Sequence, residues 1–90
     1  MPRTTFAVVW SRIESHAGEK FTQIRGGEFT YKIVDGHVRP DRTNHQIPKS
    51  HFEQAFEIAP LKSTTPVQHL RGPSYIFAIL MDHRIRQSDW

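Results

Sequence analysis

The chain has 90 residues, no cysteine and a formal net charge of +3, which excludes disulfides and thiolate-bound zinc. Its hydrophobic fraction of 37% is enough for a folded core, but so short a chain has little room for a deep substrate pocket beside that core. We predict a single domain over residues 1–90, and its mild basic charge allows a polyanionic partner.

The sequence also predicts where the protein is found. No apolar stretch approaches the roughly 18 residues of a membrane-spanning helix. The opening MPRTTFAVVWSRIES has neither the long apolar region nor the small-residue cleavage site of a secretory signal. We therefore expect a cytoplasmic protein with no membrane partner.

The first expected helix covers residues 5–17. Apolar side chains recur there at helical spacing and form one face. They are Phe6, Val9, Trp10, Ile13 and Ala17. Gly18 follows, where a left-handed residue commonly ends a helix.

A β-hairpin follows in the middle of the chain. Apolar and polar side chains alternate over residues 29–34, and Asp35-Gly36 is typical of a two-residue type I′ turn. The return strand begins at His37 and ends near Pro40, because proline cannot donate to a strand ladder.

A further strand is predicted upstream, over residues 20–25, with Gly26-Gly27 as the turn into the hairpin. Phe21 and Ile24 would point to opposite faces of that strand. The expected product is a three-stranded antiparallel meander.

The second helix is expected over residues 49–58. Residues 39–46 have no apolar periodicity and indicate a loop before it. Ser50 and Glu53 have the spacing of a capping box, and Pro60 ends the apolar stripe that follows.

The last part of the chain predicts a short turn and a long helix. Thr65-Pro66 favours a short helical turn, which Gly72-Pro73 breaks. The stretch SYIFAILMDHRI, residues 74–85, is then apolar on most sides, which is typical of a central core helix.

The charged end of that helix reaches residue 86. Arg84 and Arg86 would lie near its negative C-terminal pole. A helix-turn-helix interpretation of this region is disfavoured, because a recognition helix needs polar and basic side chains.

The expected order is α-β-β-β-α-(turn)-α, with three helices on one face of a small antiparallel sheet. This is an α+β domain, winged-helix-like in its parts. The other sheet face, with Thr30, Lys32 and Arg39, would meet solvent or a partner.

Basic and amide side chains gather in and around the hairpin and the 39–49 loop. They are Arg39, Arg42, Asn44, Lys49, Lys32 and Arg25. These residue types contact phosphates and base edges, and the helix N-terminus after the loop favours phosphate. We expect a non-enzymatic, intracellular nucleic-acid-binding module, with DNA the favoured ligand. An ordinary solvated loop is the alternative, because Asp41 dilutes the charge.

Two other functions stay open. A protein-interaction or homodimerisation module would use exposed apolar side chains for which the core has no room, namely Tyr75, Phe77, Met81 and Trp90. A metal-dependent nuclease is less favoured and would use Asp35, Asp41, Glu28 and Lys32, with Glu28 and Lys32 on one strand face. The six histidines match no ligand spacing, so we expect no metal and no cofactor.

Overall fold

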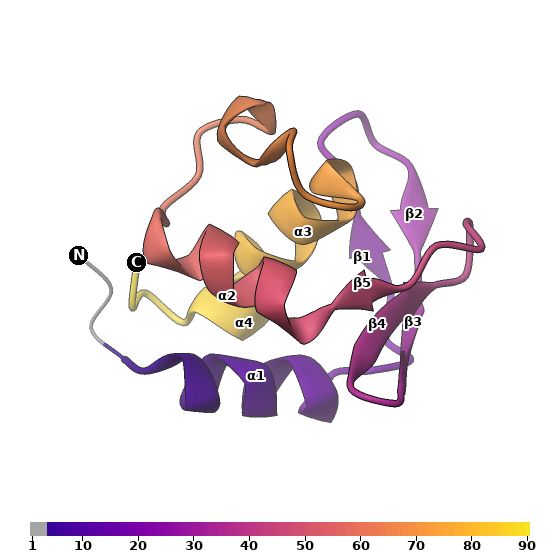
Figure 1. The fold of residues 1–90 in the computed structure, drawn as a ribbon, viewed down its shortest axis with the longest axis horizontal. Coiled ribbons are helices and arrows are strands. Elements are labelled where there is room, and N and C mark those ends of the chain that lie inside the picture. Colours follow the sequence, from indigo (N-terminus) through magenta and orange to yellow (C-terminus); the bar gives the residue numbers. More distant parts are fainter. Residues whose placement is uncertain (1–3) are drawn as a thin grey trace.

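A computed structural model describes residues 4–90, in which the helices and the strands gather at opposite ends of the molecule (Figure 1). The helices are α1 (Phe6–Ser15), α2 (Lys49–Glu57), α3 (Pro73–Leu80) and α4 (His83–Arg86), with the 3-10 turn η1 (Thr65–Val67). The strands are β1 (Phe21–Thr22), β2 (Glu28–Phe29), β3 (Tyr31–Val34), β4 (His37–Pro40) and β5 (Ile47–Pro48). The α+β class predicted from the sequence is confirmed.

The strands form two small antiparallel sheets rather than one meander. β1 pairs with β2, and a separate three-stranded sheet has the order β3-β4-β5. The sheets separate at Thr30, whose N–H donates to Oδ1 of Asp41 at 3.0 Å. The N–H of Asp41 donates in turn to the Thr30 carbonyl at 2.9 Å. Because Thr30 is held by Asp41, the predicted strand over residues 29–34 divides into β2 and β3.

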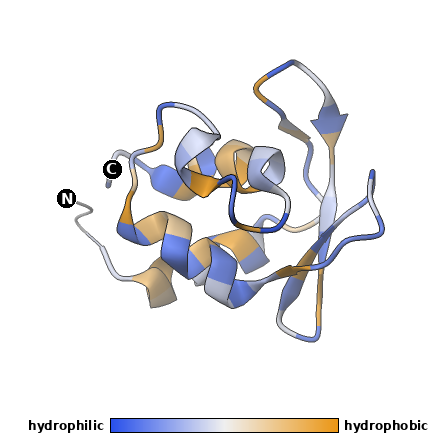
Figure 2. Ribbon diagram, turned by 45° about the horizontal axis from the view of Figure 1, so that its top comes forward, coloured by the Kyte–Doolittle hydropathy of each residue, from blue (hydrophilic) through white to orange (hydrophobic). Residues whose placement is uncertain are grey.

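The β3–β4 hairpin has the predicted turn. Asp35 and Gly36 have φ values of 50° and 74°, positive at both central positions as a type I′ turn requires. Val34 pairs with His37 directly across it. Hydrophobic and hydrophilic residues alternate along this hairpin (Figure 2), so one face can be buried while the other stays in solvent.

The core lies between the helices and the inner faces of both sheets. Ile13 of α1, Phe52 of α2 and Ile79 of α3 are all 0% exposed. Val38 and Ile47, which pair across β4 and β5, are also 0% exposed. The strand β5 was not predicted, because two residues ending in proline carry no alternation.

The first two helices lie where the sequence predicts them, except at their ends. α1 ends at Ser15 rather than at residue 17, and Gly18 has the expected positive φ, 89°. The prediction of a capping box at Ser50 is wrong. Strand β5 runs directly into α2, so Pro48 is the N-cap without a side-chain hydrogen bond, and Ser50 already lies inside the helix.

The last predicted helix is two helices. α3 ends at Leu80, and the Asp82 side chain caps α4 by accepting a hydrogen bond from the N–H of Arg84 at 2.9 Å. α4 has only four residues, so Arg84 and Arg86 do lie in the last turn of a helix as predicted, but that helix is separate from α3. The break is stabilised because an aspartate at an N-cap satisfies a free backbone N–H.

Helix length also bears on membrane crossing. α1 is 10 residues long, whereas a transmembrane helix needs roughly 20 apolar residues. None of the helices in residues 4–90 has the length and apolar character that a membrane crossing requires.

Candidate nucleic-acid interface

The outer face of the β3–β4 hairpin carries two cations directly opposite each other. Lys32 pairs with Arg39 in the strand register, and both residues are exposed. Paired residues of antiparallel strands point to the same face. Within residues 4–90, neither side chain has a hydrogen bond or an ion pair with another residue. Two predicted contact residues are thus brought together with their charges free.

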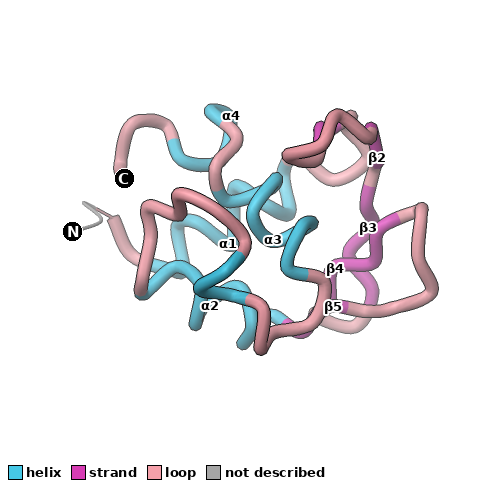
Figure 3. The backbone as a smooth tube through the Cα atoms, turned by 90° about the horizontal axis from the view of Figure 1, so that it is seen from above, coloured by secondary structure: helices cyan, strands magenta, loops and turns pink. Residues whose placement is uncertain are grey.

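The sheet is hollowed beside this pair. The hollow has a volume of about 290 Å³, and Lys32, Arg39 and Asn44 contribute to its lining. Its other lining residues are Thr30, Tyr31, Pro40, Asp41 and Thr43. Asn44 comes from the loop between β4 and β5, which extends away from the helices at the strand end of the molecule (Figure 3). Three of the six predicted residues therefore share one concave surface.

Asp41 is the acidic residue of this hollow. Its Oδ1 accepts the Thr30 N–H at 3.0 Å, and this bond holds the loop to the start of β3. One carboxylate oxygen is thereby used inside the protein. Two unpaired cations, Lys32 and Arg39, remain against this single acid, so the surface has a positive balance.

The other three predicted residues lie elsewhere. Arg42 Nη1 donates to the Glu28 carbonyl at 3.3 Å, which turns it toward the β1–β2 sheet. Arg25 lines a second hollow of about 350 Å³ beside the start of α3. Lys49 Nζ lies 5.5 Å from the centroid of the Trp10 ring, a cation–π contact. The basic surface predicted from the sequence is thus divided among four places.

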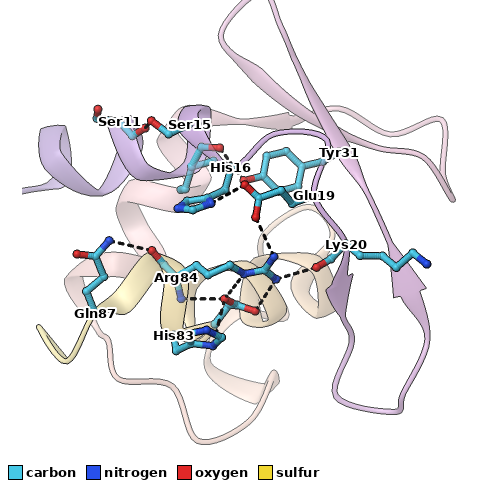
Figure 4. Close-up of polar contacts among 11 residues, drawn as sticks. Ser11, Ser15, His16, Glu19, Lys20, Tyr31, His83, Arg84 and Gln87 are labelled. Carbon is cyan, nitrogen blue, oxygen red and sulfur yellow. Dashed lines mark hydrogen bonds and ion pairs between the residues drawn. The ribbon is translucent and has the colours of Figure 1, made fainter.

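A charged cluster that the sequence did not indicate lies around Arg84 (Figure 4). Its guanidinium donates to both carboxylate oxygens of Asp82, at 2.8 and 2.9 Å. It also donates to Glu19 Oε1 at 3.1 Å and to the Lys20 carbonyl at 2.7 Å. Its carbon Cζ lies 3.9 Å from the centroid of the Phe21 ring. These contacts join α4 to the segment before β1.

The acids of this cluster are held in their charged forms. Burial of Asp82 opposes ionisation, but the hydrogen bonds and charge of Arg84 outweigh it and lower its pKa. The hydrogen bond from His16, at 2.8 Å, is the largest cause that lowers the pKa of Glu19, and Arg84 adds to it. Arg84 and its two acids are therefore bonded to one another, and their contacts hold α4 to the segment before β1.

Arg12 and Arg86 are also used inside the fold. Arg12 Nη2 lies 2.7 Å from Asp89 Oδ2, and its Nη1 donates to the Ile85 carbonyl at 2.9 Å. Arg86 donates to the Trp90 carbonyl. Arg12 lies more than 70 residues before Ile85 and Asp89 in the chain, so no local pattern could have indicated its contacts with them.

The residues predicted for an apolar interface are mostly covered. Trp90 is 9% exposed, its Nε1 donates to the Leu80 carbonyl at 2.9 Å, and its ring lies edge-on to Phe56. The expectation that Trp90 is exposed is wrong. The chain folds back after α4, so the indole ring fills the core and its N–H is satisfied.

The other three interface residues are half-buried. Tyr75 lies edge-on to Phe29, with 4.9 Å between ring centroids, and Met81 Sδ accepts the Leu61 N–H at 3.3 Å. Phe77 and Met81 line an open hollow of about 380 Å³. Most of the apolar surface of α3 is therefore used in packing.

The carboxylates of the nuclease alternative are spread apart. Asp35 lies at the tip of the hairpin, whereas Asp41 follows the opposite end of β4. Glu28 and Lys32 lie in different sheets, so the expectation that they share one strand face is wrong, because the strand divides at Thr30. In the part of the chain that the structure describes, no three His, Asp or Glu side chains are placed to hold a metal ion.

One histidine ties α2 to the segment before α3. Nδ1 of His51 accepts the backbone N–H of Arg71 at 3.0 Å, so that nitrogen carries no proton. Burial, followed by the charges of Arg71 and His69, lowers the pKa of His51. Arg71 Nη1 also donates to the Gln46 carbonyl at 3.2 Å.

No protein-family model, curated protein or solved structure matches this chain. A proposal for its function therefore depends on the geometry of its own residues.

Proposed function

We propose that the protein binds nucleic acid through the outer face of the β3–β4 hairpin, with Lys32 and Arg39 contacting phosphate groups. The supporting observation is that these cations lie directly opposite each other without an acid partner in residues 4–90. Like charges opposite each other destabilise a sheet. A phosphate between them removes that repulsion and accepts a charge-assisted hydrogen bond from each.

The hollow beside the pair supplies neutral donors for the same ligand. The amide of Asn44 and the hydroxyls of Thr30 and Thr43 line it. Such side chains contact phosphate and sugar oxygens and so position a protein on a nucleic acid. In this proposal the hairpin acts as the wing of a winged-helix domain does, with DNA as the favoured ligand and without catalysis.

Fluorescence anisotropy of labelled nucleic acid, titrated at several salt concentrations, tests the proposal. We expect binding of the wild type that weakens as salt rises, because bound cations release counterions from the phosphates. The double variant Lys32→Ala/Arg39→Ala should bind more weakly. Its slope of log affinity against log salt should be shallower by about 2, one for each lost phosphate contact.

The matched control is Lys20→Ala/Lys62→Ala. It removes the same two positive charges from exposed side chains that do not line the hollow. This variant should keep most of the affinity and the slope. Equal loss in both double variants would mean that net charge alone drives binding, and no binding by the wild type at low salt would refute the proposal.

A further inference from the structure

The aromatic rings of the strands point away from the proposed contact face. Tyr31 is 1% exposed, and its hydroxyl donates to the Ile13 carbonyl at 2.6 Å beneath the sheet. Phe29 is 2% exposed, and the ring of Tyr75 covers it edge-on. Burial raises the pKa of the Tyr31 hydroxyl, as expected for a group held inside the core. These rings are therefore committed to the interior.

The outer face has a different composition. The side chains that alternate with the buried ones along β3 and β4 are Lys32, Val34, His37 and Arg39. Of these, His37 has its Nδ1 bonded to the Asp35 carbonyl at 2.9 Å, whereas the two cations are unpaired. Along β3, β4 and β5 this face thus presents charge, the apolar Val34 and Pro48 and one bonded imidazole, but no Phe, Tyr or Trp.

This composition distinguishes between two kinds of nucleic acid. Proteins that bind single strands stack unpaired bases on exposed aromatic rings, at roughly 1–3 kcal/mol per base. A duplex keeps its bases paired and presents about one phosphate charge per 1.7 Å of helix axis. On the contact face Lys32 and Arg39 point outward, whereas Tyr31 points into the core. The face therefore has charges for the phosphates of a duplex but lacks aromatic rings on which unpaired bases could stack.

We infer, on the basis of the proposed function, that the ligand is a nucleic-acid duplex held along its phosphate backbone without reading of its bases. Lys32 and Arg39 supply the two charges, and Asn44 supplies a neutral hydrogen bond beside them. Duplex DNA and duplex RNA share this chemistry, so the experiment includes both.

Competition anisotropy tests the inference. Wild-type protein is bound to a labelled 20-base-pair DNA duplex and challenged with unlabelled duplex DNA, duplex RNA and single strands at equal phosphate concentration. We expect at least one of the duplexes to displace the probe at about fivefold lower concentration than single strands, because its phosphates are denser. A duplex of permuted sequence should compete within about twofold of the original, since phosphate contacts carry no sequence information.

Substitution Val34→Trp gives a second readout, because it adds an exposed ring next to Lys32 on the same face. Single-strand affinity should rise about fivefold while duplex affinity stays unchanged, and circular dichroism checks that the fold is kept. An unchanged single-strand affinity in the folded variant would contradict the inference.

The outcomes separate the two proposals. If single strands compete as well as duplexes do, or better, the protein still binds nucleic acid but the inference is wrong. If a permuted duplex competes far less well, base reading is present and the inference is again wrong. If neither duplexes nor single strands bind, the proposed function fails and the inference fails with it.

Discussion

The molecule uses its positive charges in two different ways in two regions, around α4 and on the β3–β4 hairpin. Around α4, Arg84 has two carboxylates, one carbonyl and one aromatic ring as partners. On the hairpin, Lys32 and Arg39 face each other with no partner in residues 4–90. In the first arrangement the charged groups are bonded to one another, and in the second the two cations have no hydrogen bond or ion pair within residues 4–90.

The comparison shows why a net charge of +3 says little about function by itself. Arginines that are bonded inside a protein offer little to a polyanion, because their donors are occupied. Arg12, Arg84 and Arg86 belong to that class. The hairpin has only two free cations, Lys32 and Arg39, but both lie on one face. Phosphate binding needs positive charge that is clustered in this way.

The largest expected effect is the difference in stability between a variant of a bonded arginine and a variant of a free one. Arg84→Ala should lower the free energy of unfolding by about 2 kcal/mol, because it leaves the partly buried Asp82 carboxylate and the Lys20 carbonyl without their donor. Arg39→Ala should change it by less than about 0.5 kcal/mol, since the side chain is exposed and unbonded. Urea unfolding followed by tryptophan fluorescence measures both.

A control sharpens that contrast. Arg84→Lys keeps the charge but loses the planar fork that reaches both oxygens of Asp82, so it should show part of the loss. Equal destabilisation by Arg39→Ala and Arg84→Ala would contradict the distinction between bonded and free arginines.

A smaller change in the free energy of unfolding, an increase rather than a decrease, is expected for a substitution on the hairpin. Lys32→Glu places opposite charges across the strands at Arg39 and should raise the free energy of unfolding by about 0.5 kcal/mol. The same variant should bind nucleic acid more weakly than the wild type. Thermal and urea unfolding, with anisotropy on the same samples, measure the two changes together.

Lys62→Glu is the matched control for this variant, because it makes the same charge change at an exposed position off the hairpin. If it stabilised the protein as much as Lys32→Glu does, reduced net charge would be the cause. The like-charged pair would then not be the reason for the gain.

The smallest effect concerns pH and the bonded His51. Its pKa in the folded protein lies below the ordinary value of 6.5, chiefly because of burial, so the unfolded chain binds the proton more readily. Its contribution to stability is therefore complete above pH 6.5 and is lost as the pH falls through the folded pKa. Unfolding free energies measured between pH 7.5 and pH 5 should show this loss.

His51→Asn should flatten that part of the profile, because its side-chain oxygen can accept the Arg71 N–H and does not titrate. His45→Asn is the control, since His45 is exposed, its side chain has no such bond within residues 4–90, and it is not among the groups that shift the pKa of His51. A profile that flattens equally in both variants would assign the pH dependence to general charge.

Part of the fold could be predicted from local patterns. The Asp35-Gly36 turn and the apolar face of α1 depend on residues within four positions of one another, so their structure follows from backbone and side-chain preferences. The break between α3 and α4 was missed, because the apolar run hid the capping aspartate at position 82. Strand β5 was missed because it exists only through its pairing with β4.

The candidate site was predicted less well than the fold. The residue types near the hairpin were named correctly as charged and polar, but the sequence could not tell that Lys32, Arg39 and Asn44 share a hollow while Lys49 lies on Trp10. Side chains from a loop and a helix start can point in many directions. Only the packing of the neighbouring elements selects one.

The sequence by itself determined the α+β class, the hairpin and most helix positions, because turn chemistry and apolar spacing act over a few residues. The tertiary structure alone decided which cations are free. Arg84 meets Glu19 and Lys20 across 65 and 64 positions of the chain, and no local pattern specifies such contacts. Lys32 and Arg39 are left without partners for the same reason, because the elements that fold beside them bring no second acid to the face.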